Sequence, residues 1–186
     1  MSHACKLAVI VAAAWLGSAP ATRAADKLIG TKAPDWEVTG WINSKPLALK
    51  DLAGNVVLVR WWTAPGCPFC AATAPSLNEF HAQYKDKGLV VVGFYHHKSA
   101  TPLDPARVKR SAEKFGFKFP VAIDPDWQTL QRWWLDREKH GWTSVSFLID
   151  RKGVIRHIHP GGQYARGDKA YAAMKAKIEE LLKEKE

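Results

Sequence analysis

The sequence predicts one α/β domain built around a mixed β-sheet. Continuous apolar runs predict buried strands over 56–62 and 89–95, and each is followed by a segment with helical spacing. A shorter strand, a further helix, a hairpin and an amphipathic helix complete the chain. Alternating strands and helices are typical of α/β folds, and the hairpin makes the sheet mixed. The length of 186 residues suits a single packed domain.

The first elements lead to a pair of cysteines. Residues 35–42 alternate in part between apolar and polar, and together with 46–55 they predict an N-terminal β-hairpin at the edge of the sheet. The run 56–62 is apolar except for Arg60, as expected of a central strand covered on both faces. Helical spacing then predicts a helix over 67–85.

Turn and capping residues mark the remaining elements. Asp104 and Pro105 predict a helix start, since Asp caps free N–H groups and Pro fits the first turn. The tripeptide RKG, 151–153, joins two short strands as a hairpin. The expected elements are a helix over 103–116, a strand over 119–124, a helix over 124–135, hairpin strands over 145–150 and 154–159, and a helix from Asp168 onward.

The first 24 residues have the pattern of a secretory signal peptide. A cationic start with Lys6 precedes a ten-residue apolar run over 7–16, and small residues allow cleavage after Ala24 or Ala21. The run is well short of the roughly 20 residues that span a bilayer, which favours cleavage over a membrane anchor. We therefore expect a signal peptide over 1–24 and a soluble mature protein in the periplasm or another extracytoplasmic compartment.

The predicted mature chain is polar at its start and basic throughout. Residues 25–34 are expected to form a loose lead-in segment before a domain over 35–186. The formal net charge is +9 for the chain and +7 without residues 1–24. Because Lys and Arg are scattered among acidic residues, we expect a generally positive surface and no nucleic-acid partner. We also expect a monomer.

The spacing of Cys67 and Cys70 fits a redox pair, a metal clamp or a structural disulfide. Cys5 lies in the expected signal peptide, so these are the only thiols of the mature chain. A structural disulfide is the weakest of the three interpretations, because closing so short a loop removes little conformational entropy from the unfolded chain. A helix that begins at Cys67 would place its sulfur where the macrodipole favours thiolate, with Pro68 in the first turn. Cys67 is then the nucleophile and Cys70 the buried resolving thiol.

Three motifs carry a family resemblance. The stretch VVLVRWWTAPGCPFCAATAPSLNEF, the later LVVVGFY and the hairpin FLIDRKGVIRHI resemble the TlpA/ResA-like branch of the thioredoxin-like oxidoreductases. The resemblance implies a thioredoxin-like three-layer α/β/α fold with Cys67 and Cys70 as the redox pair. It also implies an exported protein that reduces or isomerises disulfides of other exported proteins without a cofactor. As a reductant it would need a membrane-linked electron donor. The apolar Pro68 and Phe69 leave open whether the pair is a reductant or an oxidant.

The sequence departs from this family at three places near the cysteines. Ser144 stands where the family has a cis-proline, and we expect a trans bond there, because a cis bond before a non-proline residue costs roughly 3–4 kcal/mol. Thr73 stands where a Glu often accepts a proton, which a threonine cannot do at neutral pH. Arg60 stands where relatives carry Asn or Asp. Its charge would favour the Cys67 thiolate, or it would pair with an acid at the rim of the sheet.

The tryptophans raise a choice between packing and recognition. Trp61 and Trp62 point to opposite faces of their strand, so we expect one in the core and the other, Trp62, beside the active site as a wall that contacts peptide. Packing is the expected role of the later ones, Trp127, Trp133, Trp134 and Trp142.

Two alternative functions use the same cysteines. A copper-binding or copper-delivery protein of the Sco-like type would add a histidine to Cys67 and Cys70, and the candidates are His96, His97 and His140. The competing interpretation is that these histidines lie in solvated loops. A peroxiredoxin-type peroxidase would need Thr and Pro where this sequence has Ala64 and Arg60, so peroxide reduction ranks low.

Overall fold

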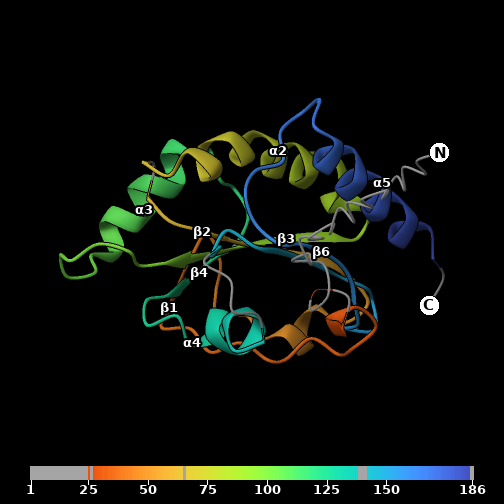
Figure 1. Ribbon diagram of the computed structural model, residues 1–186, viewed down its shortest axis with the longest axis horizontal. Helices are drawn as coiled ribbons and strands as arrows, with labels where there is room; N and C mark the ends of the chain where they lie inside the picture. Colours follow the sequence, from red (N-terminus) through yellow and green to blue (C-terminus); the bar gives the residue numbers. More distant parts are fainter. Residues whose placement is uncertain (1–24, 26, 65, 138–141, 185–186) are drawn as a thin grey trace, which may run out of the picture.

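The computed structural model describes residues 25, 27–64, 66–137 and 142–184. The expected signal peptide over 1–24 lies outside these residues. The fold consists of one mixed sheet with helices on both faces, as the α/β/α prediction requires (Figure 1). Within the described part of the chain, no helix is long and apolar enough to cross a membrane.

The sheet has six strands in the order β1-β4-β3-β2-β5-β6. The strand β2 lies near its centre, parallel to β3 and antiparallel to β5. Parallel pairing continues from β3 to β4, whereas β1 and β6 are antiparallel to their neighbours. The strand bounds are β1 Gly40–Ile42, β2 Val56–Trp62, β3 Leu89–His96, β4 Val121–Asp124, β5 Ser146–Ile149 and β6 Ile155–His159.

Three longer helices cover one face of the sheet and a short helical segment covers the other (Figure 1). On the first face lie α2 (Pro68–Tyr84), α3 (Pro105–Lys114) and α5 (Lys169–Lys183). The 3-10 turn η2 (Lys85–Lys87) follows α2 and ends at Gly88. On the opposite face lie α4 (Gln128–Leu130) and the π-helical η3 (Gln131–Leu135).

The two faces of β2 feed two separate apolar cores. Alternate residues of a strand point to opposite faces, so Leu58 and Trp62 pack beneath α2 whereas Val59 and Trp61 pack against η3. Arg60 has the same parity as Trp62 and therefore lies on the α2 side of the sheet. This position places a charged side chain under the helix that carries the cysteines.

The predicted N-terminal hairpin is wrong. Only β1 forms a strand in this region, and it pairs with β4, with Gly40 opposite Ile123. Asn43 takes a left-handed conformation (φ 64°) and its side-chain amide donates to the carbonyls of Phe117 and Phe119. This turn directs the chain away from β1, and the residues that follow form the 3-10 helix η1 (Leu49–Leu52).

Two further segments differ from expectation. The lead-in 25–34 is not loose where it is described, because the Gly30 and Ala33 amides donate to carbonyls of the β5–β6 hairpin region and Leu28 is buried. The helix expected over 124–135 begins only at Gln128. Trp127 takes a left-handed conformation (φ 61°), which no α-helix can contain.

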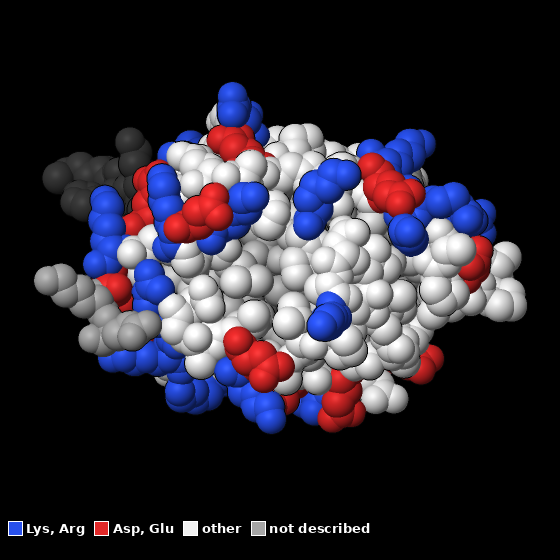
Figure 2. Space-filling view, turned by 180° about the vertical axis from the view of Figure 1, so that it is seen from behind, with Lys and Arg blue, Asp and Glu red and all other residues white. Residues whose placement is uncertain are grey.

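The charged residues of both signs are mixed on the surface. Figure 2 shows Lys and Arg interspersed with Asp and Glu around a broad area of other residues. Several of the cations are paired, as in Lys175 with Glu179 and Lys177 with Glu180 on α5.

Candidate active site

Cys67 and Cys70 form a disulfide at the N-terminus of α2, with their Cα atoms 5.3 Å apart. Cys67 is the N-cap residue, and its sulfur accepts a hydrogen bond of 3.3 Å from the Cys70 amide. Pro68 is the first helical residue, where its missing N–H is not needed. Cys67 is partly exposed, whereas Cys70 is only 3% exposed. One sulfur is thus accessible at a helix N-terminus and the other is enclosed.

The buried face of α2 continues from Cys70 to Thr73. The Thr73 hydroxyl accepts hydrogen bonds from the Tyr164 amide at 3.3 Å and from the guanidinium of Arg60 at 3.5 Å. Thr73 is 1% exposed. The position where a glutamate was expected in relatives therefore holds a hydroxyl that connects α2 to an arginine in β2.

Arg60 is completely buried and bonds to neutral groups. Its Nη1 donates to the carbonyl of Ser144 and to the hydroxyl of Ser146, and its Nη2 donates to the carbonyl of Gly162 at 2.7 Å. Its guanidinium carbon also lies 5.3 Å from the centre of the Tyr164 ring. No carboxylate pairs with it among the described residues, so the predicted pairing with an acid at the rim is wrong.

Burial and these contacts set the protonation state of the groups around Arg60. Burial lowers the pKa of the Arg60 guanidinium to about 10, which leaves it cationic at neutral pH. Burial, with the charge of Arg60 as the next cause, lowers the pKa of His159 to about 4. Burial raises the pKa of Tyr164. Both neighbours are therefore neutral at pH 7.

Ser144 lies in the segment that enters β5 beside the disulfide-bearing helix. The described part of the chain contains no cis peptide bond, so the trans bond expected before Ser144 is confirmed. Its carbonyl accepts from Arg60 and its hydroxyl accepts from the Gly162 amide at 3.1 Å. The preceding Thr143 bonds through its hydroxyl to Nε2 of His96 at 2.9 Å. These contacts hold the segment from both sides.

An aromatic pair flanks the disulfide on the surface. The ring of Phe69, between the two cysteines, meets the ring of Trp142 edge to face at 5.5 Å. Trp142 packs against Phe69 as a surface residue and is 53% exposed, unlike the buried Trp133 and Trp134. A Cβ atom at Gly161 would lie 2.6 Å from the Cβ of Trp142, so the glycine provides room for the tryptophan.

Trp62 does not border the active site as an exposed wall. Trp61 and Trp62 are both buried, at 0% and 1% exposure. The Trp62 ring packs edge to face against Tyr95 and two phenylalanines of the α3–β4 connection. The prediction that it contacts peptide is therefore wrong, and the exposed tryptophan beside the disulfide is Trp142.

The histidines considered as metal ligands are engaged by the protein. His96 is the last residue of β3 and 1% exposed, so it is not a solvated loop residue. His97 contacts the Tyr95 hydroxyl through Nδ1 and the Thr101 carbonyl through Nε2. His140 lies outside the described residues. Among the residues that the structure places, no three Cys, His, Asp or Glu side chains gather as a metal site.

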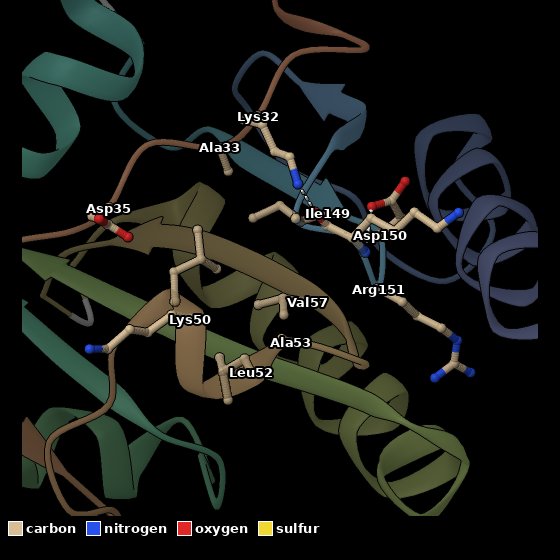
Figure 3. Close-up of a pocket in the computed structure, with 13 residues that line it drawn as sticks. Lys32, Ala33, Asp35, Lys50, Leu52, Ala53, Val57, Ile149, Asp150 and Arg151 are labelled. Atoms are coloured by element: carbon tan, nitrogen blue, oxygen red, sulfur yellow. Dashed lines mark hydrogen bonds between the residues drawn. The ribbon is translucent and has the colours of Figure 1, made fainter. Parts of the chain in front are cut away.

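A cavity of about 260 Å³ lies at the other end of the sheet, lined in part by Val57 near the start of β2 and Ile149 at the end of β5 (Figure 3). Its basic side chains do not converge on it. Lys32 donates to a backbone carbonyl of the hairpin turn, whereas Lys50 and Arg151 point away in different directions. The described residues that line it include no cysteine or histidine, so the cysteines remain the centre of the candidate site.

The sequence analysis missed Tyr164, Gly162 and Thr143. The only signal for the first two was the charge of Arg60 inside an apolar strand, which requires buried partners somewhere in the chain. The paired glycines 161–162 indicated a turn but not its contact with β2.

A mixed sheet covered on both faces, with a CxxC disulfide at the start of its first long helix, defines a thioredoxin-like protein. The chain belongs to the AhpC/TSA family, whose model matches residues 29–158. It is 33% identical over 131 residues to the thiol-disulfide oxidoreductase ResA of Bacillus thuringiensis subsp. konkukian, which covers 70% of this chain and 69% of ResA. The resemblance to TlpA/ResA-like proteins is thus confirmed.

A longer relative and two solved structures support the same assignment to the thioredoxin-like proteins. The chain is 33% identical over 154 residues to the protein DipZ of Mycobacterium tuberculosis, which covers 81% of this chain but only 20% of DipZ. A thiol-disulfide isomerase from Corynebacterium glutamicum superposes with a TM-score of 0.64 at 29% identity, covering 82% of this chain and 98% of that one. A thioredoxin-like protein in its oxidized form superposes with a TM-score of 0.65 at 27% identity, covering 86% and 99%. These relatives and the Cys67–Cys70 pair support redox exchange at the CxxC motif.

Proposed function

We propose that this protein is an exported thiol-disulfide oxidoreductase that exchanges disulfides with protein substrates through Cys67 and Cys70. The observation that carries the proposal is the asymmetry of the pair, with one sulfur accessible at the N-terminus of α2 and the other enclosed. The attacking thiol of an exchange reaction must be reachable, and the resolving thiol must be protected from substrate.

The exchange proceeds through a mixed disulfide. In the reduced protein, the Cys67 thiolate attacks a substrate disulfide and releases one substrate sulfur as thiolate. Cys70 then attacks the Cys67 sulfur, which closes the Cys67–Cys70 disulfide and releases the second substrate thiol. The reverse sequence oxidises a substrate dithiol. The free N–H groups and the dipole at the start of α2 stabilise Cys67 as the thiolate.

The cellular setting is part of the proposal. A signal peptide over 1–24 would deliver a monomeric domain over 35–186 to an extracytoplasmic compartment, where its partners are exported proteins with thiols or disulfides. The pair needs no cofactor for exchange. A membrane-linked electron donor would be required for sustained reduction.

Paired cysteine variants of the full chain test this function. Cys70→Ser should form a stable mixed disulfide with a peptide that carries one disulfide, whereas Cys67→Ser should form none under the same conditions. Mass spectrometry of the intact adducts is the readout. Equal trapping by both variants, or by neither, would contradict the assigned roles.

Two measurements separate the exchange function from copper delivery and from peroxide reduction. Sub-micromolar copper binding by the reduced pair, lost in Cys67→Ser, would favour metal delivery over exchange. Rapid formation of sulfenic acid at Cys67 with peroxide would favour a peroxidase. Exchange chemistry requires reversible two-electron cycling in metal-free protein.

A further inference from the structure

The polar cluster under α2 consists of Arg60 and the groups it contacts on Thr73, Ser144, Ser146 and Gly162, and the part of the chain that the structure describes offers its charge no counter-ion. Arg60 is 0% exposed and its described partners are carbonyls and hydroxyls. Its Nε atom has no hydrogen-bond partner among the described residues. A buried charge normally has an opposite charge beside it, because desolvation is otherwise uncompensated. No carboxylate among the described residues neutralises the Arg60 guanidinium, so its positive charge acts on the neighbouring groups.

The cysteines are the reactive groups nearest to this charge along α2. Arg60 bonds to the Thr73 hydroxyl, and Thr73 follows Cys70 by one helical turn on the same buried face. Side chains at this spacing lie roughly 5–6 Å apart at Cβ. Since the Arg60 guanidinium lies one hydrogen bond beyond Thr73, its charge is within roughly 10 Å of Cys70, and at that separation in a protein interior a unit charge changes the acidity of a thiol by about tenfold.

The other titratable groups around the cluster carry no charge at neutral pH. Tyr164 on the loop before α5 and His159 on β6 are neutral, as shown above. Burial, then the charge of exposed Lys98, lowers the pKa of His96 on β3 to about 3. The carboxylate of Asp124 lies on the opposite face, bonded to Trp61 and the backbone of α4. Arg60 is therefore the charged member of this cluster at neutral pH, and its charge adds to the positive end of the α2 dipole at the cysteines.

We propose that Arg60 is a positioning residue whose charge stabilises the thiolate forms of Cys70 and Cys67, so that their disulfide accepts electrons from substrate dithiols. This inference rests on the proposed exchange function and gives it a direction. Charge that stabilises the reduced pair relative to the neutral disulfide makes the disulfide a stronger oxidant. An acidic residue at this position would act in the opposite sense.

The step balances without another reagent. A substrate thiolate attacks the Cys67 sulfur, the Cys67–Cys70 bond breaks, and Cys70 leaves as a thiolate toward the Arg60 side of α2. The second substrate thiolate then attacks the substrate sulfur of the mixed disulfide and releases the Cys67 thiolate. Two electrons pass from the substrate dithiol to the pair, the substrate thiol protons pass to solvent, and a new substrate disulfide forms.

The test compares the full chain with Arg60→Met, Arg60→Lys and Arg156→Met. Met removes the charge and keeps the length, Lys keeps the charge, and Arg156→Met removes a structural arginine of β6 that pairs with Asp150 and Glu184. The readouts are the equilibrium constant for exchange with glutathione and the pH titration of thiolate absorbance. Arg60→Met should shift the equilibrium toward the disulfide form about tenfold and weaken thiol acidity about tenfold. Arg60→Lys should restore most of both, and Arg156→Met should change neither.

Each outcome decides the inference. A folded Arg60→Met protein with wild-type equilibrium constant and thiol titration would overturn it, and would leave Arg60 as a structural tie. If Arg60→Met does not fold, the wild-type titration decides, because a Cys67 pKa at or above the ordinary value of about 8.5 would overturn it as well. Failure of the proposed function would give a different result: the wild-type protein itself would exchange with no protein dithiol or disulfide.

Discussion

The ring of Phe69 meets the ring of Trp142 edge to face, with the ring centroids 5.5 Å apart. Phe69 lies between the two cysteines and Trp142 lies two residues before Ser144, so the contact joins the CxxC turn to the segment that enters β5. Trp142 remains 53% exposed despite this contact. A large apolar surface next to a reactive disulfide is suited to hold the chain around a substrate cysteine.

We expect Trp142→Ala to lower kcat/KM for a peptide disulfide by about tenfold, since the loss of one aromatic contact in binding costs on the order of 1–2 kcal/mol. The rate with a small reagent such as dithiothreitol should stay the same, because that reagent does not need the aromatic surface. Stopped-flow kinetics with both substrates measures the difference.

Among the described residues, a second large apolar side chain with high exposure supplies a matched control. Ile29 is 41% exposed and precedes Gly30, whose amide donates to the carbonyl of Ile155 at the start of β6, the end of the sheet away from the disulfide. Ile29→Ala should leave both rates unchanged. Equal losses in the two variants would show that Trp142 acts through general stability and not through substrate contact.

Gly161→Ala should reproduce the kinetics of Trp142→Ala although the tryptophan itself is not substituted. The glycine has φ 150°, and an added Cβ would lie 2.6 Å from the Trp142 Cβ, so the ring must move. We expect a stability loss of about 1–3 kcal/mol from strain and overpacking. Gly153→Ala, with φ 76° and open space around it, should show strain but normal peptide kinetics. Normal peptide kinetics in both variants would refute the role given to the Trp142 position.

The order of the main elements was predictable from the sequence, but strand pairing was not. Apolar runs marked β2 and β3 because both are covered on two faces, and period-2 alternation marked β1. The partner of β1 depends on tertiary contacts, since Ile123 lies opposite Gly40 only after the whole β3–α3 unit has folded. Asn43, which follows β1, and Trp127, which precedes α4, have a left-handed backbone conformation. The spacing of apolar residues does not predict this conformation.

The candidate site was predictable only at its centre. The CxxC spacing and the following helix identified Cys67 and Cys70, because their geometry is local. The partners of Arg60 lie 84 and 102 residues further along the chain, at Ser144 and Gly162. The exposed position of Trp142 also depends on packing at Gly161, so residue type alone could not separate it from the buried tryptophans.

The buried carboxylate of Asp124 predicts a stability effect independent of the redox site. It accepts hydrogen bonds from the amides of Thr129 and Leu130 and from the Trp61 indole. Asp124→Asn turns one acceptor into a donor that faces these N–H groups, so we expect a loss of about 1–3 kcal/mol in urea denaturation. Asp126→Asn, an exposed neighbour, should change stability by less than about 0.5 kcal/mol. A similar loss in both variants would contradict this account.

His96 predicts that the protein loses stability as the pH falls. Burial lowers its folded-state pKa to about 3, below the unfolded value of 6.5. Because the unfolded chain takes up the proton first, the stability is complete above pH 6.5 and is lost progressively between pH 6.5 and about 3. At about 1.4 kcal/mol per pH unit, the loss by pH 5 amounts to roughly 2 kcal/mol.

Two variants separate the contribution of His96 from that of other groups that titrate in the same pH range, such as His159. His96→Gln can keep a hydrogen bond to the Thr143 hydroxyl but cannot take up a proton, so the slope of unfolding free energy against pH should become shallower. Thr143→Val removes the hydrogen bond and keeps the histidine, so it should lower stability at every pH and leave the slope in place. Urea midpoints between pH 5 and pH 7 measure both. An unchanged slope in His96→Gln would mean that the histidine is already protonated, or is exposed, in the folded protein at pH 5.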